Sequence, residues 1–179
     1  MRSLHAFLLA AVALSAVAAA YDARKGEIPN ALTLGPLALA LPVHALLEAP
    51  HGMKAAALAL AASVGGAALC ALVPLLLYWK GAIGGGDVKL LAALGALLGP
   101  SVGLEATTYA FVAAALIAPA RMAWEGKLLA TLGNTLALVV NPLLPAARRR
   151  PLAPEMLTWM RFGPSIFVGT LAAAVARWS

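Results

Sequence analysis

Long apolar runs separated by short polar segments dominate the pattern of this chain. A helix that crosses a lipid bilayer needs roughly 20 apolar residues, or somewhat fewer where the bilayer thins or the end residues snorkel. The runs that approach this length are Ser3–Tyr21, Ala31–Leu47, Ala55–Trp79, Val88–Gly103, Ala106–Ala120 and Phe162–Ala176. The pattern therefore predicts an all-α fold, a polytopic membrane helix bundle with about six transmembrane helices.

The stretch Leu128–Ala147 is also apolar, but asparagines and prolines interrupt it. With six spans and the N-terminus outside, ten of the 13 Lys and Arg residues fall on the cytoplasmic side, in accord with the tendency of basic residues to stay inside. These ten are Arg24, Lys25, Lys80, Lys89, Arg121, Lys127, Arg148, Arg149, Arg150 and Arg161. A seventh crossing would move Arg148–Arg150 outside. We therefore expect Met122–Met160 to be cytoplasmic and to include a helix in the membrane interface.

The first apolar run also has features of a secretory signal peptide, since it follows Arg2 and ends in Ala18-Ala19-Ala20. Cleavage there would leave Tyr21-Asp22 at a free terminus, so we interpret the run as an uncleaved membrane helix. No internal repeat or low-complexity linker divides the sequence. We expect residues 1–179 to form a single integral-membrane domain.

The composition supports a membrane location. Hydrophobic residues make up 63% of the chain and charged residues only 11%, whereas about a quarter of a typical soluble domain is charged. The net charge of +6 does not indicate nucleic acid, because the basic residues lie at the ends of apolar runs, where they meet anionic lipid headgroups. The single cysteine, Cys70, allows neither an intrachain disulfide nor a Cys-pair metal site.

The chain contains only two aspartates, Asp22 at the end of the first run and Asp87 at the start of the fourth. In the six-span topology both lie at the cytoplasmic ends of helices, where an ionisable group is a candidate for function. Two carboxylates in one partly desolvated site cannot both ionise easily, so one keeps a proton while the other activates water. Position alone also allows Asp22 to be a solvated helix-end charge and Asp87 to be an ordinary N-cap.

The three glycines before Asp87 allow further interpretations of this segment. The segment from Gly84 to Lys89 does not match a phosphate-binding loop, which requires Gly-x-x-x-x-Gly-Lys-Ser/Thr. Three glycines can serve as a flexible link. They would also let an extended peptide backbone approach Asp87 closely, as proteolysis requires.

Three stretches together resemble the type IV prepilin peptidase family. Gly84-Gly85-Gly86-Asp87-Val88-Lys89 resembles its Gly-x-Gly-Asp motif, and Asp22-Ala23-Arg24-Lys25-Gly26-Glu27-Ile28-Pro29-Asn30 resembles its other catalytic stretch. Arg161-Phe162-Gly163-Pro164 is similar to the Phe-Gly-Pro that opens its last helix. Three matches in the right order are far more specific than any one alone.

The resemblance implies that Asp22 and Asp87 are the catalytic pair and that Gly84 and Gly86 are the motif glycines. Supporting roles follow for Arg24, Pro29, Asn30 and Lys89, although structural roles fit these residues equally well. The chain is similar to the short, Tad-type form of the family, which lacks a zinc-binding cytoplasmic insertion, so we do not expect methyltransferase activity.

The resemblance also implies a substrate and a location. The substrate would be a prepilin or pilin-like protein whose short basic leader is removed at the cytoplasmic face of the inner membrane, without a metal or organic cofactor. An alternative keeps the aspartic chemistry but makes the protein an intramembrane protease like presenilin or signal peptide peptidase, since Tyr21-Asp22 mimics their first motif. A further alternative, from another functional class, is a non-catalytic membrane scaffold or small transporter. The sequence does not indicate an oligomeric state.

Overall fold

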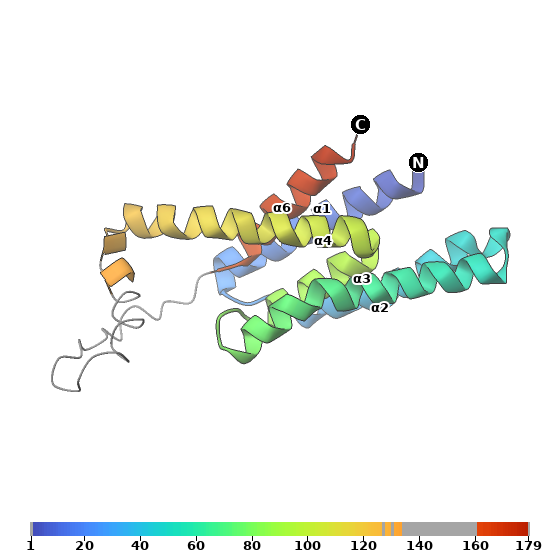
Figure 1. The fold of residues 1–179 in the computed structure, drawn as a ribbon, viewed down its shortest axis with the longest axis horizontal. Helices are drawn as coiled ribbons and strands as arrows, with labels where there is room; N and C mark the ends of the chain where they lie inside the picture. The colour runs from blue at the N-terminus through green and yellow to red at the C-terminus, as the bar shows by residue number, and fades with distance from the viewer. Residues whose placement is uncertain (1, 127, 130, 134–160, 179) are drawn as a thin grey trace. The chain divides into compact units, whose positions relative to one another are not determined.

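The computed structural model describes residues 2–126, 128–129, 131–133 and 161–178 (Figure 1). Within these ranges the elements are all helical, and no strand occurs. In chain order they are α1 (Arg2–Lys25), α2 (Asn30–Glu48), the short 3-10 helix η1 (Ala49–His51), α3 (Met53–Trp79), α4 (Gly85–Trp124) and α6 (Gly163–Ala176). The predicted all-α membrane bundle is confirmed.

The contacts divide the chain into two compact units. The first consists of Met1–Ala114 and Arg161–Ser179 and contains both aspartates, and the second is Ala115–Met160. In the second unit, α4 ends near an ion pair of 2.9 Å between Arg121 and Glu125. Most of the predicted interfacial segment lies outside the described residues, and the single domain stays a prediction.

Helix α4 is broken at Gly99, whose φ of 74° and ψ of 177° are not helical. Glycine adopts a positive φ without the steric penalty that a Cβ brings. Beyond this break the chain folds back, because a Cβ placed on Gly103 would lie only 2.9 Å from the Cα of Gly95. Residues eight apart in a straight helix are about 12 Å apart. The predicted spans Val88–Gly103 and Ala106–Ala120 therefore correspond to the two arms of α4, with the turn a few residues earlier than expected.

Small residues let α3 approach the first arm of α4. A Cβ on Gly66 would overlap the carbonyl oxygen of Gly95, and a Cβ on Gly95 would lie 2.8 Å from Cys70. The hydroxyl of Ser63 donates a hydrogen bond of 2.8 Å to the carbonyl oxygen of Ala96. Close backbone approach of this kind is typical of helices that associate within a bilayer.

The distribution of large and small apolar side chains also indicates lipid surroundings. Ala11, Ala93 and Ala96 are fully buried, whereas Leu46 and Leu58 are 70% and 62% exposed. A protein in water would bury its leucines, but leucine facing outward is stable in hydrocarbon. By length and composition, α1, α2, α3 and α4 can each cross a membrane, while α6 is an apolar helix of 14 residues. The number of crossings and their orientation stay predictions.

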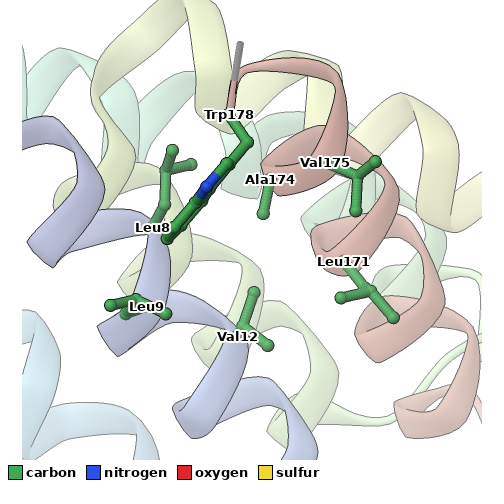
Figure 2. A pocket seen from close by; sticks show the side chains of 7 residues that line it. All are labelled: Leu8, Leu9, Val12, Leu171, Ala174, Val175 and Trp178. Carbon is green, nitrogen blue, oxygen red and sulfur yellow. The ribbon is translucent and has the colours of Figure 1, made fainter.

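Helices α1 and α6 pack side by side, and an apolar hollow lies between them away from the aspartates (Figure 2). Figure 2 shows its side chains, which come from both helices: Leu8, Leu9, Val12, Leu171, Ala174, Val175 and Trp178. None of these side chains is ionisable. The hollow therefore offers a surface for hydrocarbon rather than groups for catalysis.

Candidate active site

Asp22 lies one turn before the end of α1, and its side chain is only 6% exposed. The helix ends because Gly26 turns the chain with a φ of 74° and donates its N–H to the carbonyl oxygen of Asp22 over 2.9 Å. A C-terminal glycine in this conformation is a common helix stop. The backbone carbonyl of Asp22 thus bonds at the end of α1, while its side-chain carboxylate contacts a different helix.

That helix is α6, which begins 141 residues later in the sequence. The backbone N–H of Gly163 donates a hydrogen bond of 2.9 Å to Oδ2 of Asp22. The first N–H groups of a helix have no partner within it, and α6 has no cap from its own N-cap side chain. Asp22 therefore supplies the cap from α1, and a carboxylate in this place is favoured by the helix dipole.

Asp87 lies in the first turn of α4 and is 7% exposed. Its Oδ2 accepts a hydrogen bond of 3.2 Å from the N–H of Gly84, and its own N–H returns one of 3.2 Å to the carbonyl oxygen of Gly84. Because α4 begins at Gly85, Asp87 is its third residue, and its carboxylate reaches back to the N–H of the residue before the helix. Asp87 therefore caps α4 from within its first turn and is not itself the N-cap residue that the sequence allowed. Its Oδ1 is buried and has no hydrogen-bond partner among the described residues. Capping alone leaves that oxygen unexplained.

Asp22 lies near enough to Asp87 for the like charges of their carboxyl groups to act on each other. A further contact joins the stretches that carry them. A Cβ on Gly86 would lie 3.1 Å from Cβ of Ile28, so the glycine run packs directly on the loop after Asp22. Spacing could not show that the two stretches lie together, and the approach of Gly86 to Ile28 brings them side by side. That the two carboxyl groups form one catalytic site stays a prediction.

Other predicted site residues occupy the same end of the first unit. Pro29 and Asn30 open α2, with Pro29 at the N-cap position, and Lys89 donates a hydrogen bond of 2.9 Å to the side-chain oxygen of Asn30. Gly84 contacts Asp87, since a Cβ there would lie 3.1 Å from its Oδ2. Arg24 is exposed and lines a pocket on the surface of α1.

The Arg161-Phe162-Gly163 turn binds the end of α1 in a second way. The guanidinium of Arg161 donates to the carbonyl oxygen of Ala23, and the buried ring of Phe162 packs on Phe111 with centroids 5.2 Å apart. Sequence reasoning marked this turn as a motif but did not find the bond from Gly163 to Asp22. The only sequence signal for that bond was the Phe-Gly-Pro match itself.

No group of three or more His, Cys, Asp or Glu side chains placed to hold a metal occurs within the described ranges. The arrangement at this end is two buried carboxyl groups, one held by a helix N-terminus and the other by a glycine N–H. A pair of this kind can activate a water molecule with one member and polarise a carbonyl group with the other.

Residues 8–119, more than half of the chain, match the family model of the type IV leader peptidase family. The matched region contains both aspartates and the loop that carries Ile28. Neither the curated proteins nor the solved structures include a match.

Proposed function

Because the chain belongs to the type IV leader peptidase family, we propose that it is a membrane aspartic endopeptidase that removes the leader of prepilin-like substrates. Family membership makes it a protease of the leader peptidase type with a protein substrate. The aspartic chemistry, the prepilin substrate and the cytoplasmic face of the inner membrane belong to the proposal.

The observation that carries the proposal is the buried pairing of Asp22 and Asp87. They are the only aspartates of the chain, they come from α1 and α4, and their exposed fractions are 6% and 7%. Burying carboxyl groups at a helix end is unfavourable without a compensating role. Their electrostatic interaction supports a shared reaction rather than two separate helix caps.

In the proposed reaction, one aspartate acts as a general base and takes a proton from water, which attacks the scissile carbonyl carbon. The other aspartate, protonated, polarises the carbonyl oxygen. The pair then returns a proton to the nitrogen of the leaving amine as the C–N bond breaks. No metal or organic cofactor takes part in this proposal.

The position of the pair suits a particular substrate geometry. A pilin-like precursor has a short basic leader followed by a long apolar helix, and its cleavage site lies where the two meet. Such a junction would lie at the membrane surface. Both aspartates belong to the last or first turns of apolar helices, which supports cleavage at that depth.

Co-expression with a tagged prepilin tests the proposal. Removal of the leader is followed by gel shift and mass spectrometry for wild type, Asp22→Asn and Asp87→Asn. Wild type should cleave, and both variants should lose cleavage while inserting normally. Glu48→Gln is the matched control, because it also removes a carboxylate charge but is exposed at the end of α2, near His51.

Two results of the cleavage experiment would argue against the proposal. Cleavage by both aspartate variants at the wild-type rate would contradict the catalytic pair. Cleavage within the membrane helix of the substrate, rather than at the leader junction, would favour an intramembrane protease like presenilin instead.

A further inference from the structure

The two carboxyl groups of the pair have different surroundings, although the chemistry needs only one base and one acid. Asp22 accepts a hydrogen bond of 2.9 Å from the first N–H of α6. Asp87 accepts a longer bond of 3.2 Å from Gly84, and its second oxygen has no partner among the described residues. This asymmetry distinguishes their roles.

The carboxylate of Asp22 lies at a helix N-terminus, which is a binding site for anions. Helix N-termini carry a partial positive charge and unpaired N–H groups, and both stabilise an anion there. In α6 the next residue, Pro164, has no N–H, so Gly163 is the donor directed at the carboxylate. The glycine is required for this approach, because a Cβ at residue 163 would lie 2.8 Å from Oδ2 of Asp22.

The position of Asp87 favours its neutral form. A buried carboxylate whose oxygen lacks a donor loses hydration without compensation, and a neutral carboxyl group loses much less. Two cations of the described residues at this end bond to other atoms. The ammonium of Lys89 bonds to Asn30 and the guanidinium of Arg161 bonds to Ala23. Among the described residues, the charge that acts on Asp87 is that of Asp22, which has the same sign.

We propose that Asp22 is the ionised general base, that Asp87 is the proton-bearing acid, and that Gly163 positions the base. This inference rests on the proposed function. Water gives one proton to Asp22 while its oxygen bonds to the scissile carbon, and Asp87 gives its proton to the carbonyl oxygen. The C–N bond of the resulting tetrahedral diol then breaks. Asp22 passes its proton to the amine nitrogen, and Asp87 regains one from a hydroxyl of the diol, so both groups return to their starting states.

The composition of the chain makes a direct test possible. With only two aspartates, protein labelled with 13C at aspartate Cγ gives two side-chain carboxyl signals in solid-state NMR of membrane-embedded enzyme. Asp22 precedes Ala23 and Asp87 precedes Val88, so pairwise labelling of the adjacent amide nitrogen assigns each signal without a mutation. At neutral pH the Asp22 signal should be that of a carboxylate and the Asp87 signal that of a carboxylic acid.

The reverse assignment, or the same protonation state at both residues, would overturn the proposal. This measurement needs no substrate, so its failure is distinguishable from failure of the cleavage test. If the wild-type enzyme gave the expected NMR assignment but did not cleave prepilin, the proposed function would be contradicted. The different protonation states of Asp22 and Asp87 would still stand.

Gly163→Ala tests the positioning role. The added methyl group should displace the Asp22 carboxylate, so the NMR signal of Asp22 should move toward that of a carboxylic acid. The value of kcat should fall about 10- to 100-fold, with a smaller change in KM. Gly35→Ala is the control, since a Cβ there has no atom within 4 Å, and it should leave both signals unchanged. Reduced cleavage with both NMR signals unmoved would mean that Gly163 has a structural role only. If Gly163→Ala does not insert, the wild-type assignment still decides the roles of the aspartates.

Discussion

The ammonium of Lys89 donates a hydrogen bond of 2.9 Å to the side-chain oxygen of Asn30. Lys89 lies two residues after Asp87 on α4, and Asn30 is the first residue of α2, after the loop that follows Asp22. The bond therefore ties together the two stretches that carry the aspartates, 59 positions apart in sequence. It gives Lys89 a partner other than a carboxylate.

Lys89→Met and Asn30→Ala should each lower kcat/KM for leader removal by about two- to fivefold, because an exposed hydrogen bond contributes on the order of 0.5–1 kcal/mol. Methionine keeps most of the apolar stem of Lys89. If the bond is the shared cause, the double variant should be no worse than either single variant, as a double-mutant cycle measures. Losses that multiply in the double variant would contradict a role through this bond.

Gly86→Ala should lower cleavage by about tenfold or more, since a clash costs about 1–3 kcal/mol and the added methyl group would press on Ile28. The loop after Asp22 would then move away from Asp87. Ile28→Ala in the same chain should restore part of the activity by making room. Initial cleavage rates of the single and double variants measure this, and a double variant worse than both singles would refute the contact.

Gly66→Ala should destabilise the protein by about 1–3 kcal/mol or more, because its methyl group would overlap the backbone of α4. The neighbouring Gly65 provides a matched control, since a Cβ there has no atom within 4 Å. Gly65→Ala should leave stability unchanged or raise it by about 0.5–1 kcal/mol through helix propensity. Thermal unfolding in detergent separates the two variants, and equal behaviour would argue against close packing of α3 on α4.

Cys70 should resist thiol reagents while the protein is folded, because its side chain is 0% exposed where α3 meets Gly95 and Gly103. A maleimide should label the protein only after unfolding in denaturing detergent. Labelling before unfolding would show that the two helices separate readily. In the Gly66→Ala variant, labelling should begin at a lower temperature than in the wild type.

The apolar pattern predicted most of the helices, because a spanning segment is encoded locally by its own hydrophobicity. The turn in α4 was placed near residue 104 rather than at Gly99, since hydrophobicity does not change at the break and only the backbone conformation of glycine marks it. The start of α4 was placed at Val88, where the apolar run begins, although the helix begins at Gly85.

The rarity of the aspartates and their positions at helix ends made them candidates for function, and the motif resemblance implied that they are the catalytic pair, which stays a prediction. Their proximity could not be derived from spacing, because it depends on how the loop after α1 packs against the start of α4. The bond from Gly163 to Asp22 was beyond sequence reasoning for a related reason, since a backbone N–H leaves no trace in residue type. Motif resemblance marked the turn, and only the tertiary structure gave it a chemical partner.

The capping of α6 by Asp22 has a consequence for biosynthesis. Chains emerge from the ribosome N-terminus first, so α1 with Asp22 is made early and Gly163 follows 141 residues later. Once Asp87 has also been made, both aspartates exist, but Asp22 lacks the donor that α6 brings. In a nascent chain, Asp22 therefore stays without this hydrogen bond until α6 has been made and docks on α1. If Asp22 is the base, the chain cannot cleave its substrate before that step.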